Sequence, residues 1–191
     1  MLLENDVLVY VPKSKIDGET AASNGAGVDQ SELSAEIYLM HKENGNVQKA
    51  RLLGEKLAEM VVQDLPKIED NSEDWVLIDH LKLLYIFVAE QIIRENPEAI
   101  LAQISLSAFR EAIEKAVPGA YSAISGCSAD TFYKLAYYQN EPDEVARNMG
   151  STMAQLCGKA NDWKVITIAE HLFTVFQKRC QQECKKTEFV L

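Results

Sequence analysis

Cys127 is the side chain of this sequence that comes closest to a reactive pattern. It stands in residues 125–130, directly before an expected helix, and the partial positive charge of a helix N-terminus stabilises a thiolate. A cysteine nucleophile also needs a base, and no histidine stands near it in the sequence. The serines and the aspartate around it are typical of a helix-capping turn. The sequence therefore predicts no catalytic residue and favours a binding protein over an enzyme.

The histidines and cysteines do not form a metal-binding pattern. A di-metal carboxylate bundle needs a glutamate three residues before a histidine, and His41, His80 and His171 all lack one. The four cysteines follow no zinc-ligand spacing, and the chain has no glycine-rich phosphate-binding loop. The sequence therefore predicts no metal and no cofactor.

Arg51 and Arg147 are candidate anion-binding residues, because they occupy matching positions of a sequence frame that occurs twice. In a cleft between the two copies, their guanidinium groups could hold an anion. The alternative is a local ion pair, since Glu55 stands one helical turn after Arg51. The anion-binding hypothesis predicts that both arginines point into one concave site.

Three tyrosines on one expected helix are candidate binding residues. Tyr133 and Tyr137 share a helix face, and Tyr138 lies about 100° further round. Tyrosine is favoured at interfaces because its ring is apolar and its hydroxyl is polar. These side chains could line a groove for a partner; the alternative is that they pack at the edge of the core.

The charge of the chain excludes two classes of partner. Its 191 residues include 29 Asp and Glu against 19 Lys and Arg, a formal net charge of −10. Nucleic acids and anionic membrane surfaces attract basic faces, so we expect neither as a partner. The most apolar run, residues 76–89, is too short and too charged to cross a bilayer, and the first residues lack the pattern of a secretory signal. The expected location is the cytoplasm.

The candidate residues are expected on helices or at helix ends. From residue 31 onward, apolar residues recur with helical spacing, and glycine and proline residues break the pattern at intervals. The second helix, for example, is expected to end before Pro66. The sequence predicts an all-α fold of about seven helices in antiparallel hairpins, at residues 32–43, 46–64, 73–95, 97–117, 128–140, 142–158 and 162–186.

The first 30 residues differ from the rest in composition. Residues 7–11 are β-branched and aromatic, which is typical of a short strand or an extended arm, and the following residues have the Gly, Ala, Ser and Asn content of a linker. An isolated strand needs a partner, so Val7, Val9 and Val11 are candidate contacts with a second subunit. The sequence predicts an arm and linker at 1–30 and a single helical domain at 31–191.

An Ala-Arg-x-x-Gly-x-x-x-Ala frame occurs at residues 50–58 and again at 146–154. When residues 36–60 are aligned with 132–156, identical pairs occur at Leu39/Leu135, Asn44/Asn140, Ala50/Ala146, Arg51/Arg147, Gly54/Gly150 and Ala58/Ala154. Further on, after a difference in loop length, Trp75 coincides with Trp163. We interpret this pattern as an internal duplication of a three-helix unit, with copies at about 32–95 and 128–186 and a bridging helix at 97–117.

The frame places small residues one helical turn apart, which predicts a packing role. Glycine inside a helix costs about 1 kcal/mol relative to alanine, so the missing side chain must serve close packing against another helix. We expect that neighbour to be the preceding helix of the same hairpin. The helix-packing residues predicted in this way are Ala50, Gly54, Ala58, Ala146, Gly150 and Ala154, together with Trp75 and Trp163.

Three apolar residues interrupt the polar face of the third expected helix. Leu83, Ile86 and Phe87 stand among charged positions, so this helix is buried nearly all round or meets a second subunit. The features together favour a helical module that binds a protein or peptide, or its own copy as a homodimer. The alternative is a small-ligand-binding protein or enzyme with a pocket between the two copies, lined by Arg51, Arg147 or Cys127.

Overall fold

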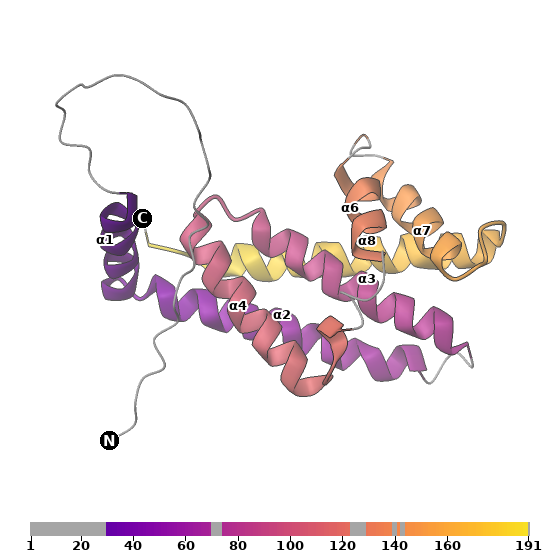
Figure 1. The fold of residues 1–191 in the computed structure, drawn as a ribbon, viewed down its shortest axis with the longest axis horizontal. Coiled ribbons are helices and arrows are strands. Elements are labelled where there is room, and N and C mark those ends of the chain that lie inside the picture. The colour runs from indigo at the N-terminus through magenta and orange to yellow at the C-terminus, as the bar shows by residue number, and fades with distance from the viewer. Residues whose placement is uncertain (1–29, 70–73, 123–128, 139–140, 142–143, 191) are drawn as a thin grey trace, which may run out of the picture.

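A computed structural model describes residues 30–69, 74–122, 129–138, 141 and 144–190 of the chain (Figure 1). These residues form helices and no β-strand, which confirms the predicted all-α fold. The arm with Val7, Val9 and Val11 lies outside the described residues. The helices are α1 (Gln30–Glu43), α2 (Asn46–Glu69), α3 (Trp75–Arg94), α4 (Ala99–Ala116), α6 (Ala129–Tyr138), α7 (Val145–Leu156) and α8 (Trp163–Lys186).

Aspartates cap the two helices that begin with tryptophan. Asp74 Oδ1 accepts a hydrogen bond from the backbone N–H of Leu77 at 3.1 Å, and Asp162 Oδ1 accepts one from that of Lys164 at 3.0 Å. Each bond satisfies a backbone donor that the first turn of a helix leaves unpaired. The Asp-Trp pair that the two halves of the sequence share is therefore a capping motif.

Helix α2 continues through Pro66 and ends at Glu69. The predicted end before Pro66 is therefore wrong by about one turn. Proline lacks one backbone donor and disfavours the helical conformation of the residue before it, but it does not forbid that conformation. The remaining hydrogen bonds of α2 suffice to carry the helix one turn further.

Helix α2 packs against α4 with its backbone in direct contact at Gly54. A Cβ atom built on Gly54 would lie 2.1 Å from the carbonyl oxygen of Ser105 and 2.9 Å from the amide nitrogen of Phe109. Ala50 and Ala58 are buried on either side of it. The small residues thus permit close helix packing, but the neighbour is α4. The prediction of the preceding helix is wrong, because α1 packs beside the start of α2 and does not reach Gly54.

The second small-residue stripe packs against a different neighbour. A Cβ atom on Gly150 of α7 would lie 2.5 Å from the carbonyl oxygen of Ile166 in α8. In the alignment of the two copies α8 corresponds to α3, whereas the partner of Gly54 is α4. The two frames therefore make non-equivalent contacts, and the interpretation as an internal duplication is not confirmed. A shared requirement for close helix packing accounts for the shared frame.

Helix α3 occupies the middle of the molecule and contacts α2, α4, α6, α7 and α8 (Figure 1). Its residues from Leu84 to Ile93 are all buried, so the expectation of a helix buried nearly all round is confirmed for its second half, whereas Trp75, Val76 and Asp79 in its first half are exposed. Helix α8 runs along the length of the molecule and exposes one side. Because α3 contacts most of the other helices, a site in the middle of the molecule includes residues of α3.

The C-terminal residues lie against the turn between α1 and α2 (Figure 1). The side-chain amide of Asn46 is fully buried: its Nδ2 donates to the carbonyl oxygen of Val190 at 2.7 Å, and its Oδ1 accepts from the Val190 N–H at 2.8 Å. Lys49 Nζ donates to the carbonyl oxygen of Glu188 at 2.6 Å. These bonds fix residues 188–190 to the α1–α2 turn and so tie both ends of the helical domain together.

Candidate functional site

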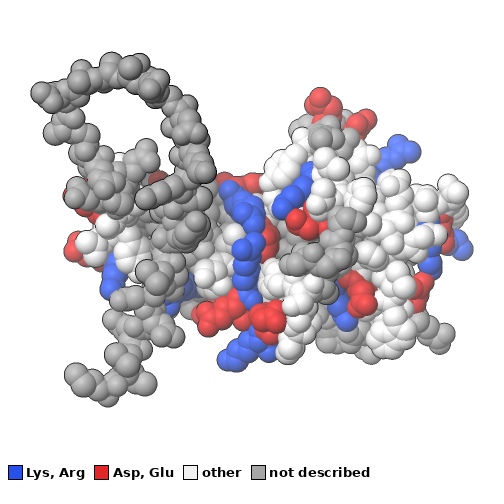
Figure 2. Space-filling model, in the orientation of Figure 1, with Lys and Arg blue, Asp and Glu red and all other residues white. Residues whose placement is uncertain are grey.

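The strongest candidate site is a cavity of about 280 Å³ between α3, α4 and α6. In Figure 2, basic side chains gather over the middle of the face in view, with acidic side chains beside them. The cavity has an apolar floor and a charged rim. The floor is formed by Leu83, Ile86, Phe87, Ala129 and Tyr133, and the rim by Glu90, Arg94, Arg110, Tyr121, Asp130 and Lys134.

One face of α3 supplies both the floor and part of the rim. Leu83, Phe87, Glu90 and Arg94 follow each other at intervals of three or four residues, so their side chains share one stripe of the helix. The N-terminal half of this stripe, Leu83 and Phe87, is apolar, and the C-terminal half, Glu90 and Arg94, is charged. The interruption of the polar pattern in the sequence therefore marks the wall of a cavity.

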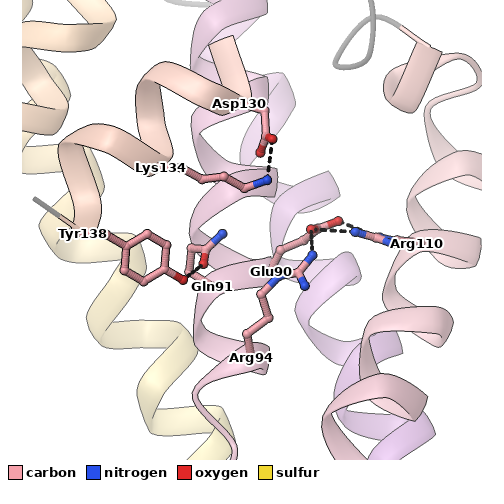
Figure 3. Close-up of polar contacts among 7 residues, drawn as sticks. All are labelled: Glu90, Gln91, Arg94, Arg110, Asp130, Lys134 and Tyr138. Atoms are coloured by element: carbon pink, nitrogen blue, oxygen red, sulfur yellow. Dashed lines mark hydrogen bonds and ion pairs between the residues drawn. The ribbon is translucent and has the colours of Figure 1, made fainter. Parts of the chain in front are cut away.

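Glu90 is the buried centre of an ionic cluster whose two arginines are partly exposed (Figure 3). Its side chain receives two hydrogen bonds from Arg110, Nε to Oε1 at 2.8 Å and Nη2 to Oε2 at 2.9 Å, and one from Arg94, Nη2 to Oε2 at 3.0 Å. Burial by itself raises the pKa of Glu90, but the hydrogen bonds and charges of the two arginines outweigh burial and hold that pKa below its ordinary value. The cluster holds one negative and two positive charges at neutral pH.

Tyr121 lies beside this cluster, just after α4. The guanidinium carbon of Arg110 lies 5.7 Å from the centre of its ring. Its hydroxyl is buried beside Glu90 and Arg110, near enough for both to affect its pKa, and forms no well-aligned hydrogen bond with the described residues. Burial, and next the negative charge of Glu90, raise the pKa of Tyr121, so its hydroxyl keeps its proton. An unpaired buried hydroxyl costs about 1–3 kcal/mol, which a ligand with an acceptor atom would recover.

Helix α6 closes the other side of the cavity. Lys134 Nζ pairs with Asp130 Oδ2 at 2.6 Å, and both side chains are partly exposed. Figure 3 shows this pair on one side of Glu90 and Arg110 on the other. The charges of Lys134 and Asp130 balance each other, so the cavity as a whole keeps the excess positive charge of the arginine cluster.

The three tyrosines of α6 do not line one groove. Tyr133 is only 1% exposed and lines the cavity. Tyr137 is partly buried, packs its ring against Phe87, and donates a hydrogen bond to Glu95 Oε1 at 2.6 Å. The ring of Tyr138 is exposed, and its hydroxyl donates to the buried Gln91. Only Tyr133 therefore belongs to the candidate site.

The other sequence-predicted binding residues lie elsewhere. Arg51 and Arg147 are both exposed, and neither lines the cavity. The hypothesis that they share one concave site is wrong, because the helix face that carries each of them points away from its packing partner. Cys127 lies outside the described residues.

Two groups of predicted contact residues are also corrected. Ile86 and Phe87 are buried within the chain and, with Leu83, line the cavity, so contacts within the chain account for their burial without a second subunit. Trp75 is 70% exposed and Trp163 is 68% exposed, so neither packs in the core. Each stands at the first position of its helix, where its side chain projects beyond the neighbouring helices.

Few signals in the sequence indicate the charged rim of the cavity. Glu90 and Arg94 stand one turn apart in the apolar second half of α3, which is a detectable signal for an ion pair. Arg110 comes from another helix and Tyr121 from the turn after it, and no spacing relates them to Glu90. Only the packing of α4 against α3 brings these residues together.

A larger, open groove of about 560 Å³ lies between α2 and the end of α8. It contains three lysines, and each of them already has a partner: Lys49 bonds the Glu188 carbonyl oxygen, Lys56 pairs with Glu59, and Lys186 pairs with Glu183. We therefore regard this groove as a weaker candidate than the cavity.

Comparison with protein-family models, with curated proteins and with solved structures finds no match to this chain. Within the described ranges, none of the helices combines the length and the apolar character needed to cross a membrane. The same part of the chain contains no group of three or more His, Cys, Asp or Glu side chains that could hold a metal ion.

Proposed function

We propose that this protein is a binding module for a peptide or protein, and that the cavity between α3, α4 and α6 takes one group of that partner. The observation that carries the proposal is the buried Glu90 held by the partly exposed Arg94 and Arg110, next to the buried hydroxyl of Tyr121. A buried ionic cluster stabilises a fold little compared with apolar residues of similar size, and an unpaired buried hydroxyl destabilises it. Both features face one cavity with an apolar floor, which is the usual composition of a ligand site.

The chemistry of the rim supports binding rather than catalysis. Glu90 has a lowered pKa and both of its carboxylate oxygens accept hydrogen bonds, so at neutral pH it has no proton to give and is a weak base. Tyr121 has a raised pKa and remains a donor. These groups hold fixed charges and hydrogen-bond donors, which suits recognition of a ligand.

The size of the cavity supports a partner that presents a single group. About 280 Å³ is at the lower end of the range for small-molecule sites, which is roughly 300–1,000 Å³. One side chain or one chain end fits such a volume. The partly exposed rim residues Arg94, Arg110 and Lys134 surround the opening and would contact the rest of the partner.

A selection from a displayed peptide library tests this proposal. Leu83→Trp places a large side chain in the cavity, and Leu135→Trp, on the exposed side of α6, is the matched control. We expect peptides selected on the wild-type chain to bind the Leu135→Trp variant equally and the Leu83→Trp variant at least tenfold more weakly. Equal binding to both variants, with both folded by circular dichroism, would contradict the proposal.

Self-association is a second candidate function, favoured by two exposed tryptophans at one end of the molecule. Helices α3 and α8 begin at the same end, where Lys159 forms an ion pair with Asp74 (Figure 1). Trp75 and Trp163 are exposed there, and aromatic residues are enriched at interfaces. Sedimentation velocity of the wild-type chain and of a Trp75→Ala, Trp163→Ala variant tests this candidate. A wild-type monomer, or a dimer that the variant retains, would exclude the tryptophan end as the contact.

A further inference from the structure

The hydrogen-bonding groups of the cavity between α3, α4 and α6 are unequally satisfied. Both oxygens of Glu90 accept hydrogen bonds from Arg94 and Arg110. A guanidinium group carries five N–H donors, and these bonds leave Nη1 of each arginine for another acceptor. The buried hydroxyl of Tyr121 is a further donor. The site offers donors and few acceptors, so a complementary ligand group must bring acceptor atoms.

The charge of the cavity points in the same direction. Glu90 cancels one of its two arginine partners, and Asp130 cancels Lys134, so one positive charge remains at the rim. The chain as a whole carries a net charge of −10, which makes this local excess of positive charge unusual for the molecule. A planar carboxylate fits the fork of a guanidinium group with two acceptor atoms.

The floor sets the second property of the ligand. Leu83, Ile86, Phe87 and Tyr133 present aliphatic and aromatic surface beneath the arginines. A free inorganic anion would leave this surface uncovered, whereas an apolar group attached to the anion would cover it and remove it from water.

We propose that the cavity binds a carboxylate carried on an apolar group, with Arg94, Arg110 and Tyr121 on the carboxylate and the floor of α3 and α6 on the apolar part. The inference rests on the proposed function and names the group that enters the site. Such a group occurs at the C-terminus of a peptide with an apolar last residue and in small aromatic carboxylic acids. Glu90 is a positioning residue, since it holds the two arginines without contacting the ligand.

Titration of the ¹⁵N-labelled chain by NMR tests the inference. The probes are 3-phenylpropionate, its neutral isostere 3-phenylpropanamide, inorganic phosphate, and N-acetyl-Ala-Ala-Phe with a free or an amidated C-terminus. We expect 3-phenylpropionate to shift the backbone amides of residues 83–94 and 129–134, and to bind at least tenfold more tightly than 3-phenylpropanamide. Equal binding of acid and amide, binding of phosphate as tight as that of the acid, or shifts confined to other residues would overturn it.

Two variants locate the carboxylate. Arg110→Gln removes the positive charge and the guanidinium donors, and Tyr121→Phe removes one hydroxyl donor. The loss of a hydrogen bond to a charged group corresponds to a fall in affinity of about tenfold or more. Arg147→Gln, an exposed arginine remote from the cavity, is the control and is expected to bind as the wild type does. Tyr121→Phe keeps the charge of the cluster, so it tests the site even if Arg110→Gln disturbs the fold. Unchanged affinity in a folded Tyr121→Phe variant would remove Tyr121 from the site.

The two peptides separate this inference from the proposed function. If the free-acid peptide binds the cavity and the amidated one does not, both stand. If both peptides bind equally, the peptide-binding function stands and the carboxylate inference fails. If 3-phenylpropionate binds and neither peptide does, the carboxylate inference stands for a small-molecule ligand and the peptide-binding function fails.

Discussion

Gly54→Ala is expected to destabilise the protein, although alanine is the better helix former. In an unconstrained helix the substitution would stabilise by about 1 kcal/mol. In this fold the added Cβ would lie 2.1 Å from the Ser105 carbonyl oxygen and 2.9 Å from the Phe109 amide nitrogen, where an ordinary contact needs at least 3.4 Å. Both are backbone atoms, so α4 must move as a unit. Overpacking of this kind costs about 1–3 kcal/mol or more, and we place this rigid contact at the upper end, with a net loss of about 2 kcal/mol.

The free energy of unfolding from urea denaturation, followed by circular dichroism, measures this effect. Gly150→Ala meets the Ile166 carbonyl oxygen at 2.5 Å, so it is expected to destabilise in the same direction but less. Glu55→Ala, at an exposed neighbouring position of α2, is the control and is expected to change the free energy by no more than about 0.5 kcal/mol. A Gly54→Ala variant as stable as the wild type would refute the close contact of α2 and α4.

The movement of α4 has a consequence for the cavity. Arg110 lies on α4 and reaches Glu90 on α3 through two hydrogen bonds. If the added methyl group pushes α4 away from α2, the geometry of these bonds changes. We therefore expect Gly54→Ala to weaken binding at the cavity as well as stability, and Gly150→Ala to weaken stability with less effect on binding.

Three further predictions concern other parts of the molecule. The pKa of Glu90 is lowered in the folded chain, so its contribution to stability is full above the ordinary glutamate pKa of about 4.3 and is lost as pH falls through the lower folded value. Between pH 7 and pH 3, the free energy of unfolding from urea denaturation should therefore fall less in Glu90→Gln than in the wild type. An equal fall in both would contradict the ionic cluster. Asn46→Ala removes the two bonds to the C-terminal residues and is expected to cost about 2 kcal/mol at about 1 kcal/mol for each bond; unchanged hydrogen exchange of the Val190 amide would show that the contact does not hold the tail. Trp75→Ala and Trp163→Ala are expected to change the free energy of unfolding by no more than about 0.5 kcal/mol each, because both side chains are exposed, whereas a buried tryptophan would lose about 3–5 kcal/mol.

Local signals in the sequence were sufficient for the elements of the fold. Helical spacing of apolar residues predicted the all-α class and the approximate range of each helix. Pro66 was misleading, because a proline lowers the stability of a helix without ending it in every context. Asp74 caps α3 although several residues before this helix are good caps, and the choice among them depends on where the helix meets its neighbours.

The same local signals did not predict which helices pack against each other. Gly54 and Gly150 share a sequence frame, and the frame predicted close packing for both, yet their partners are the non-equivalent helices α4 and α8. Trp75 and Trp163 were expected to pack between helices because they coincide in the alignment of the two copies, but both are exposed at the starts of their helices. The residue pattern of one helix predicts that its face packs closely against a neighbour, but it does not predict which helix that neighbour is.

The sequence by itself determined the helices, their approximate ends, the close helix packing at Gly54 and Gly150, and the burial of the second half of α3. These properties depend on residues close together in the chain, where hydrogen bonding and side-chain spacing act over a few residues. Only the tertiary structure decided the candidate site, because Glu90, Arg110, Tyr121 and Tyr133 come from separate elements and meet through the packing of α4 and α6 on α3. Electrostatic interactions and cavities depend on distance in space, and in a helical array that distance is set by the choice of neighbours.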